Sequence, residues 1–311
     1  MLGVNVILDS RNAMSLLQDT LDMIRVKPGK KFRLKDHDPA WAGDPNIPKK
    51  ERKTFAEKIL SEDLTALAKA QDLLYASDSY AILLVFQAMD AAGKDSTIKH
   101  VMSGVNPQGC QVVSFKHPSV EELDHNFLWR YAKALPERGR IGIFNRSYFE
   151  EVLVVKVHPA ILANQRIPGG KPKKDVWQAR YDDINNFERH LTQNGTVILK
   201  FFLHLSKEEQ RKRFLERLND PGKHWKFSDS DMRERGYWDD YMRAYEDCLS
   251  ATSTEWATWH VIPADYKWVT RAMVATIITT AIQGLDLKYP EVTREKQQQI
   301  AAAKKELEET G

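Results

Sequence analysis

Hydrophobic residues form five short, nearly uninterrupted runs along the middle of the chain. The runs lie at residues 81–86, 111–115, 141–144, 196–205 and 260–262. Each run is separated from the next by a helical pattern, which is typical of parallel strands covered by helices on both faces. The pattern therefore predicts an α/β fold with a parallel five-stranded sheet flanked by helices.

Apolar residues with a period near 3.6 predict the helices between these strands. The clearest example is residues 54–75, where Phe55, Ile59 and Leu67 fall on one face. Further helices are predicted at residues 94–104, 119–134, 147–156, 175–193, 206–218, 229–251 and 267–285. Residues 293–309 are rich in Ala, Lys, Glu and Gln, and predict a solvated terminal helix.

Pro, Gly and charged residues are concentrated ahead of the first predicted helix. Residues 25–53 contain RVKPGKKFRLK and DPAWAGDPNIPKK, a composition that disfavours regular elements. We therefore divide the chain into an N-terminal arm at 1–53, a central domain at 54–290 and a solvated C-terminal helix at 291–311.

Composition restricts the classes of partner. The 311 residues are 42% hydrophobic, and 46 Lys and Arg against 43 Asp and Glu leave a net charge of +3. This balance gives no general basic field, so we expect no nucleic-acid partner. Two cysteines, Cys110 and Cys248, are too few for a disulfide scaffold. With no evident secretory leader and no apolar run of about 20 residues, we expect a cytoplasmic protein that does not bind membranes.

A loop suited to phosphate binding follows the first predicted strand. After AILLVF the chain continues as QAMDAAGKDST and then enters a helical pattern. Backbone amides at the start of this helix, the helix dipole and Lys94 would together attract phosphate oxygens. The candidate contacts are Ala91, Ala92, Gly93, Lys94, Asp95, Ser96 and Thr97.

The loop departs in two places from the pattern GxxxxGK[ST]. Ala88 replaces the first Gly, and Asp95 replaces the Ser or Thr after Lys94. An ordinary turn between strand and helix is therefore an alternative. Asp90 favours phosphate binding. An acidic residue in a loop that binds polyanions is explained if it binds the accompanying Mg²⁺ or orients an attacking phosphate oxygen. Its other role would be as the N-cap of the helix.

Polar residues also follow the other strands at the same edge of the sheet. Ligands of open α/β sheets gather beyond the carboxyl ends of the strands, so Asn145 and Arg146 should lie near the loop. Arg146 is placed to clamp phosphate, and Lys116 follows the second strand. His117 has no Cys or His cluster beside it and is no candidate metal ligand. Asp265 would contact nucleotide or cap the next helix.

Basic residues are in excess at 207–226, KEEQRKRFLERLNDPGKHWK. Arg213 and Arg217 are four residues apart and share a helical face, with Arg211 as a third candidate. A solvated face paired with neighbouring glutamates is one interpretation. The other is a lid that closes over the transferring phosphoryl group, because this helix follows the fourth strand, as lids do in P-loop kinases. We expect Trp225 and Trp238 to serve packing.

These motifs together resemble the second family of polyphosphate kinases. The resemblance runs from about residue 25 to about residue 289, and is carried by FQAMDAAGKDST, GVNPQG, IGIFNRSYFEEVLVVKVHP, ILKFFLHLSKEEQRKRFLERL and WKF. It implies a P-loop kinase fold similar to thymidylate kinases, with a helical lid at about 206–230. It also implies transfer of the terminal phosphoryl group between inorganic polyphosphate and AMP or ADP, with Mg²⁺ or, in its place, Mn²⁺.

The resemblance assigns roles to single residues. The family's modified Walker A loop falls on Asp90, Gly93 and Lys94, with Asp90 as the metal-site acid, and its Walker B arginine falls on Arg146. Asn145 stands where subclasses restricted to diphosphates have Asp, which resembles the subclass that accepts both AMP and ADP. Glu150 matches the acid linked with monophosphate acceptance.

The sequence departs from the family pattern at two positions. Ser96 stands where Gly is usual and Tyr148 where His is expected, and both bear on nucleotide or metal preference. Residues 169–174, GGKPKK, would contact the polyphosphate chain or form a surface turn. The resemblance also implies adenine nucleotides as acceptors, with guanine nucleotides as a further option, and a homo-oligomer.

Two other functions are compatible with a phosphate loop. One is a nucleoside monophosphate kinase that uses ATP as donor. The other is a non-catalytic P-loop protein that senses nucleotides or binds nucleic acid. Formation of ADP or ATP from polyphosphate and AMP or ADP distinguishes a polyphosphate kinase from both alternatives.

Overall fold

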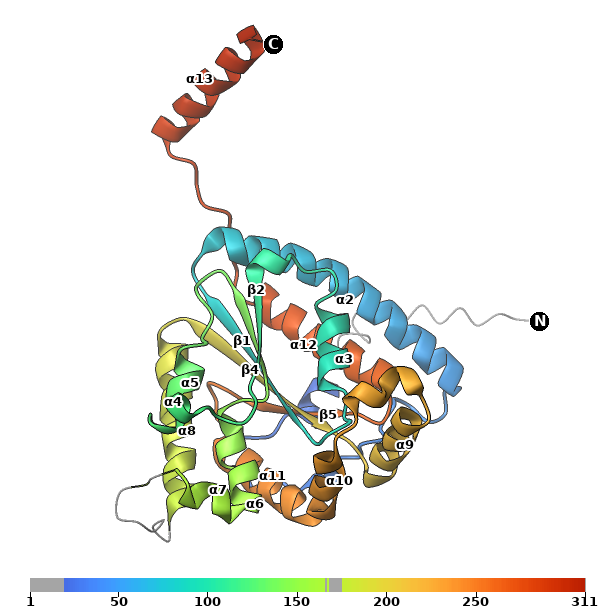
Figure 1. The fold of residues 1–311 in the computed structure, drawn as a ribbon. Helices are drawn as coiled ribbons and strands as arrows, with labels where there is room; N and C mark the ends of the chain where they lie inside the picture. Colours follow the sequence, from blue (N-terminus) through green and yellow to red (C-terminus); the bar gives the residue numbers. More distant parts are fainter. Residues whose placement is uncertain (1–19, 166, 168–174, 311) are drawn as a thin grey trace, which may run out of the picture.

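A computed structural model of the chain describes residues 20–165, 167 and 175–310, and has a five-stranded parallel sheet at its centre (Figure 1). The strands are β1 (Ala81–Ala88), β2 (Cys110–Ser114), β3 (Ile141–Asn145), β4 (Thr196–His204) and β5 (Trp259–Pro263). Their order in the sheet is β2-β3-β1-β4-β5, and every neighbouring pair is parallel. The predicted fold class is confirmed, with each strand within two residues of its predicted bounds at either end.

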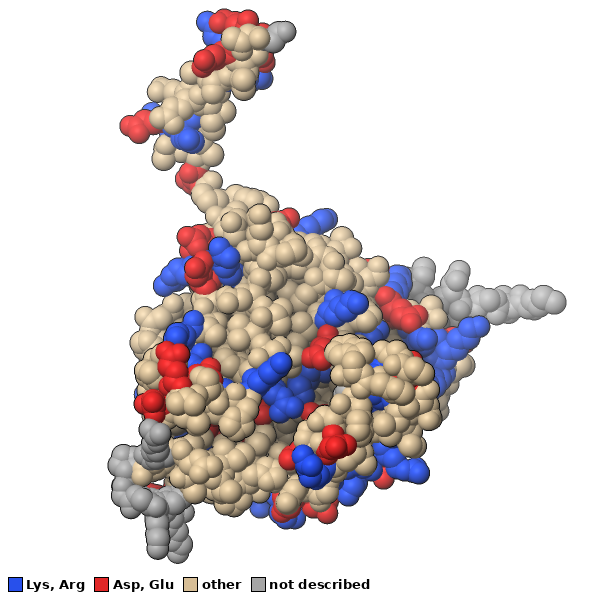
Figure 2. All heavy atoms as spheres, in the orientation of Figure 1, with Lys and Arg blue, Asp and Glu red and all other residues tan. Residues whose placement is uncertain are grey.

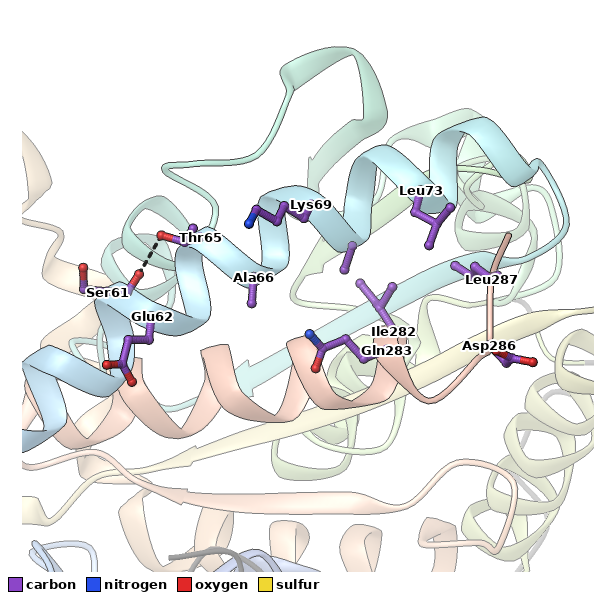
Figure 3. A pocket seen from close by; sticks show the side chains of 11 residues that line it. Ser61, Glu62, Thr65, Ala66, Lys69, Leu73, Ile282, Gln283, Asp286 and Leu287 are labelled. Carbon is purple, nitrogen blue, oxygen red and sulfur yellow. Dashed lines mark hydrogen bonds between the residues drawn. The ribbon is translucent and has the colours of Figure 1, made fainter. Parts of the chain in front are cut away.

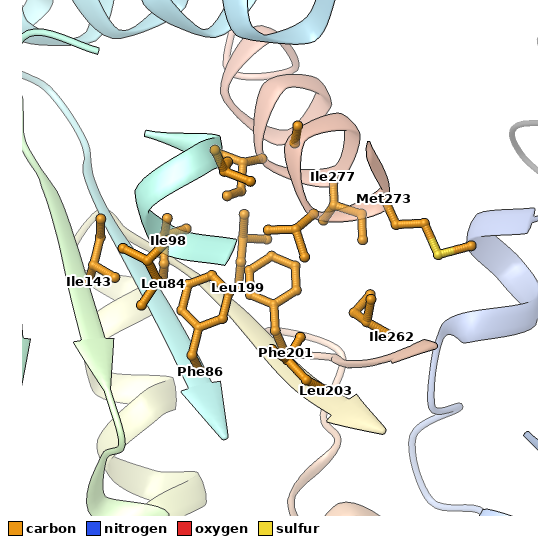
Figure 4. Close-up of a cluster of buried hydrophobic side chains, with 14 of the residues drawn as sticks. Leu84, Phe86, Ile98, Ile143, Leu199, Phe201, Leu203, Ile262, Met273 and Ile277 are labelled. Atoms are coloured by element: carbon orange, nitrogen blue, oxygen red, sulfur yellow. The ribbon is translucent and has the colours of Figure 1, made fainter. Parts of the chain in front are cut away.

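Both faces of the sheet are buried, which explains the uninterrupted apolar runs. Along β1, Leu84 and Phe86 enter the hydrophobic cluster on one face, and Leu83 and Val85 enter the cluster on the other. The first cluster lies under α2 (Lys49–Ser77), α3 (Lys94–Val101) and α12 (Lys267–Gln283) (Figure 4). The second lies under α8 (Val176–Gln193) and α11 (Trp238–Thr252).

Several helices match their predicted ranges, including α8, α9 (Lys207–Leu218) and α12. The predicted start of the first helix, residue 54, is wrong, because α2 starts at Lys49, directly after Pro48. Its first turn, KKERK, is charged and largely exposed, and so carries no apolar periodicity. Proline before or at the start of a helix is well tolerated because the first amides have no intrahelical acceptor.

Three predicted helices are wrong because each is divided into shorter elements. Residues 119–134 form α4 (Val120–Leu123) and α5 (Trp129–Ala132), and the Asn126 side chain between them accepts from the Leu128 amide. Residues 147–156 form η3 (Tyr148–Glu151) and α6 (Val154–Val157), followed by α7 (Pro159–Ala163). Residues 229–251 form α10 (Asp229–Gly236) and α11, which meet at Gly236.

The arm is irregular from residue 25 to residue 48 apart from one short helical turn, whereas residues 49–53, also predicted to be irregular, belong to α2. The described part of the arm is packed against the domain. It contains the turns of η1 (Leu34–Asp36), and the Val26 amide donates to the Trp259 carbonyl of β5 at 2.9 Å. Val26, Phe32 and Leu34 are buried in the second cluster. The arm therefore belongs to the domain's core.

The remaining elements are η2 (Pro107–Gly109), η4 (Pro221–Lys226) and α13 (Arg294–Thr310). α13 extends away from the domain in Figure 1, and none of its residues is buried. No helix within the described ranges is long and apolar enough to cross a membrane. Both cysteines are free thiols, and burial raises the pKa of Cys110 to about 11 and of Cys248 to about 12.

Candidate active site

The phosphate loop connects β1 to α3 at the carboxyl end of the sheet. Its backbone is left-handed at Ala91 (φ 63°) and Gly93 (φ 102°), which turns the chain sharply into α3. Gly93 is the N-cap of α3 and no side chain caps this helix. The alternative role of Asp90 as N-cap is therefore excluded.

Lys94 folds back over the loop that precedes it. Its Nζ donates to the Ala88 carbonyl at 2.9 Å, so the ammonium lies across the end of β1. Burial, and then the nearby charge of Arg146, lower the pKa of Lys94. The charges of Lys94 and Arg146 therefore interact in a place that also holds the carboxylates of Asp90 and Glu150.

Helix α9 holds three successive carbonyls of the loop. Gln210 Nε2 donates to the Asp90 carbonyl at 2.9 Å. Arg213 Nη1 donates to the carbonyls of Ala91 at 3.1 Å and Ala92 at 2.9 Å. Gln210 and Arg213 are both buried, at 1% and 7% exposure. The loop is therefore fixed from behind by side chains more than a hundred residues away in sequence.

The remaining donors of Arg213 are also bonded. Its Nη2 donates to the carbonyls of Ala264 and Asp265, at 2.7 and 3.1 Å, and its Nε to Glu209 at 2.9 Å. A guanidinium has five N–H groups, and all of them are used here. In this structure Arg213 is an internal support of the loop, because the carbonyls around it need donors, and its membership of a lid stays a prediction.

Arg146 lies between two carboxylates on the other side of the loop. Its Nη2 is 3.0 Å from Asp90 Oδ1, and its Nη1 is 3.0 Å from Glu150 Oε2. Gln87 Nε2 donates to the second oxygen of Glu150 at 2.8 Å. The charge of Glu150, more than that of Asp90, raises the pKa of Arg146 above its ordinary value and outweighs burial. Arg146 is thus a permanent cation, and its φ of 64° is a left-handed backbone typical of strained functional positions.

The first turn of α3 is tied to two neighbouring elements. Asn145 Nδ2 donates to Asp95 Oδ1 at 2.6 Å, and Arg271 Nη2 of α12 donates to Ser96 Oγ at 2.9 Å. Thr97 is buried beneath this turn. Ser96, which departs from the family pattern, thus links α3 to α12.

The other predicted residues lie farther from the loop's contacts. Arg217 Nη1 pairs with Asp231 of α10 at 3.1 Å. Arg211 and Lys116 have exposed side chains. Asp265 does not cap α12, because its Oδ1 accepts from the Ser206 amide at the start of α9, and its contact with nucleotide stays a prediction. Residues 169–174, the predicted basic loop, lie outside the described residues.

The two tryptophans of this region differ. Trp238 is buried, as predicted for a packing residue, whereas Trp225 is 78% exposed and the prediction for it is wrong. Trp225 lies in η4, a short turn between α9 and α10.

Sequence reasoning missed Gln210, Arg271 and Asp231. Gln210 could have been found, because it lies three residues before Arg213 and so on the same helical face. Arg271 and Asp231 carried no local signal, since α12 and α10 reach the site only through the fold.

A divalent cation would find its oxygen ligands at Asp90. No group of three or more His, Cys, Asp or Glu side chains suited to a metal occurs within the described part of the chain. Mg²⁺ commonly binds one or two carboxylates together with substrate phosphates and water. The half-exposed Asp90 carboxylate beside the loop fits that donor set.

A hollow lined with basic side chains lies on this side of the molecule. Figure 2 shows Lys and Arg gathered between the lobe of α9 and α10 and the segment of α4 and α5. Next to it, a cavity of about 370 Å³ is lined by Pro118, Phe127, Arg130, Glu151 and Arg180, among others. Arg130 is bonded to the Lys116 carbonyl at 2.9 Å, so this cavity begins where β2 ends.

A larger cavity, of about 720 Å³, lies elsewhere. It is bounded by α2 and the end of α12, where Ala66, Lys69, Ile282 and Gln283 line the space between the two helices (Figure 3). None of its lining residues belongs to the phosphate loop.

Comparisons with known proteins agree with this geometry. A family model described as Polyphosphate kinase 2 matches residues 49–290. An ADP-polyphosphate phosphotransferase of Rhodopseudomonas palustris is 54% identical over 258 residues, covering 83% of this chain and 89% of the relative. An AMP/ADP-polyphosphate phosphotransferase of Meiothermus ruber is 44% identical over 267 residues, covering 86% and 94%. The crystal structure of Polyphosphate Kinase 2 from Arthrobacter aurescens TC1 has a TM-score of 0.80 at 38% identity, over 90% of this chain and 95% of that one.

Proposed function

The chain belongs to the polyphosphate kinase 2 family, and on that premise we propose which residues carry its reaction and which nucleotides it accepts. The protein is a phosphotransferase that moves phosphoryl groups between polyphosphate and nucleotides. The observation that carries the residue assignment is the convergence of Asp90, Lys94 and Arg146 at the carboxyl end of the sheet.

Both AMP and ADP are acceptors in this proposal. The relatives are named for ADP and for AMP and ADP together, so the names alone leave both acceptors open. Asn145 and Glu150 support the dual choice, because a neutral side chain at 145 repels an incoming monophosphate less than Asp would. Guanine nucleotides are a further option.

The reaction is a direct, in-line transfer. A terminal phosphate oxygen of the nucleotide attacks the terminal phosphorus of polyphosphate, and the bond to the shortened chain breaks. Lys94 and the amides of the loop neutralise the donor, while Arg146 stabilises the charge that develops on the equatorial oxygens. Arg213 contributes by holding the loop in place, and Arg217 and Arg211 bind phosphates of polyphosphate farther along the chain. Lys116 contacts the acceptor.

Mg²⁺ is the proposed cofactor, with Mn²⁺ as a substitute. Asp90 would hold it, and the bound cation would neutralise charge on the phosphates. Arg146 lies 3.0 Å from the Asp90 carboxylate and so fixes the direction of this side chain.

The base of the acceptor enters the cavity beside Glu151. Support comes from its position, since Glu151 follows Glu150 directly and the cavity begins at the end of β2. Its volume of about 370 Å³ is in the range of small-molecule sites. Phe127 offers a ring face, and Arg130 and Arg180 are buried donors held by Glu151. A Phe127→Ala variant should raise KM for the nucleotide but not for polyphosphate.

One experiment tests the proposed function. Purified protein is incubated with Mg²⁺, polyphosphate and either AMP or ADP, and the nucleotides are separated. We expect ADP and ATP from AMP, and ATP from ADP. A kinase that uses ATP alone, or a nucleotide sensor, would form neither product from polyphosphate.

Cellular location and assembly complete the proposal. We propose a cytoplasmic protein, supported by two free cysteines. We also propose a homo-oligomer, following the resemblance to the family. Gel filtration with light scattering measures the oligomeric state directly.

A further inference from the structure

Helix α10 brings an acidic side chain to the edge of the active site. Asp231 lies in the first turn of α10, and its Oδ2 accepts from Arg217 Nη1 at 3.1 Å. Both side chains are only 20% exposed. This pair is therefore more shielded from water than an ordinary surface ion pair.

Asp231 also interacts with the charges around the loop. Its carboxylate is close enough to Asp90 to repel it and close enough to Arg146 to be attracted. Burial, and then the charge of Asp90, raise the pKa of Asp231. An anion here thus lies against Arg217, as a phosphate oxygen would, and within reach of the charge of Arg146.

The helix that carries Asp231 is itself anchored. Arg235 of α10 donates to Gln210 Oε1 at 2.7 Å and to the Lys207 carbonyl at 2.9 Å. Gln210 in turn holds the Asp90 carbonyl. Because α10 is tied to α9 in this way, the backbone that carries Asp231 is held beside Arg217.

We propose that Asp231 takes the place of a phosphoryl oxygen on Arg217 and competes with polyphosphate for this cation. The inference rests on the proposed function and adds a residue that sets affinity for the polyanion. While the site is empty of substrate, Asp231 neutralises Arg217. When polyphosphate binds, its oxygens replace the carboxylate. Asp231 is thus a positioning residue that acts through Arg217.

Polyphosphate binding without nucleotide is the first test. Asp231→Asn keeps the shape of the side chain but removes its charge, and Asp231→Ser serves as a second variant should the first fail to fold. Calorimetry should give a Kd for polyphosphate about three- to fivefold lower than that of the wild type, the range expected for a partly shielded ion pair. KM for polyphosphate should fall equally, with kcat and the nucleotide KM unchanged. Asp229→Asn, an exposed residue in the same turn, is the matched control and should change nothing.

A double-mutant cycle separates competition from other roles. In an Arg217→Ala background, Asp231→Asn should no longer change the affinity for polyphosphate. Weaker binding by Asp231→Asn, or a loss of kcat at unchanged KM, would overturn the inference in favour of a metal-binding or structural role. If the wild type binds no polyphosphate, the proposed function itself fails. If it binds polyphosphate and the variants bind no tighter, only this inference fails.

Discussion

Asn145 at the end of β3 donates a 2.6 Å hydrogen bond to the carboxylate of Asp95 in the first turn of α3. The amide therefore bridges the strand that carries Arg146 and the helix that begins at Lys94. An aspartate at position 145 would place two carboxylates in contact, and such a pair repels strongly unless one is protonated. The choice of residue at this position bears on both the geometry and the charge of the acceptor site.

Asn145→Asp should reduce the AMP reaction more than the ADP reaction. The added charge repels a monophosphate that must lie deeper in the site, and we expect the ratio of kcat/KM for AMP to that for ADP to fall about five- to tenfold. Steady-state kinetics with both acceptors measure this ratio. Glu150→Ala, which removes a partner of Arg146, should shift the ratio in the same direction. Equal losses on both acceptors would mean that the two residues serve catalysis or folding in general.

Lys94→Ala should abolish turnover and leave the fold intact. The ammonium acts where charge develops on the phosphoryl group, so its loss should lower kcat by a factor of about 10³ or more. Lys99→Ala, an exposed lysine on the same helix, is the control and should keep wild-type kinetics. A Lys94→Ala enzyme with half the normal turnover would exclude Lys94 from the site.

Arg213→Ala should destabilise the protein as well as inactivate it. Four buried or half-buried carbonyls lose their donor together, and we expect the free energy of unfolding to fall by about 2–4 kcal/mol. Chemical denaturation measures the change. Arg211→Ala, on the exposed side of the same helix, should be close to neutral. A fully stable but inactive Arg213→Ala protein would instead support a direct role in phosphoryl transfer.

Acid should destabilise the protein through two buried histidines. Burial lowers the pKa of His204 and of His260 from the ordinary 6.5 to about 4. Between pH 6.5 and 4 the unfolded chain therefore binds protons that the folded protein does not, so stability present above pH 6.5 is lost as the pH falls. Each histidine should contribute a loss of about 1.4 kcal/mol per pH unit.

Thermal melting between pH 7 and 4.5 tests this dependence. A His260→Gln variant should show a shallower decline of Tm with falling pH. His117→Asn removes an exposed histidine and should follow the wild-type curve. Parallel curves for all three proteins would show that protonation of His260 does not destabilise the fold.

The strands and the phosphate loop could be predicted because their signals are local. A strand buried on both faces needs an apolar run such as residues 81–86, and Lys94 follows such a run at the required spacing. The divided helices could not be predicted in the same way, because the break at Asn126 depends on one side chain that accepts from a backbone amide. The periodicity of apolar residues is a property of a whole segment, so it does not reveal a break caused by one such contact.

The candidate site was predictable only in part, for a related reason. Asp90, Lys94 and Arg146 follow strands, and the sheet brings strand ends together whatever the helices do. Asp231 and Arg271 reach the same region from helices, so their position depends on packing that a sequence pattern does not reveal. Arg213 was singled out, but its role depends on which of its neighbours are carbonyls.

The contacts from Gln210 and Arg213 to the loop carbonyls have a consequence for the opposite side of the same peptide bonds. A peptide unit is planar and trans, so fixing the carbonyl of one residue fixes the direction of the next residue's amide. Holding the carbonyls of Asp90 and Ala92 therefore orients the amides of Ala91 and Gly93 before any phosphate arrives, while the Ala92 amide donates to the Met89 carbonyl at 3.3 Å. The conformational entropy of these amides is lost during folding rather than during binding. Helix α9 thus preorganises an anion site through side chains that never touch the anion.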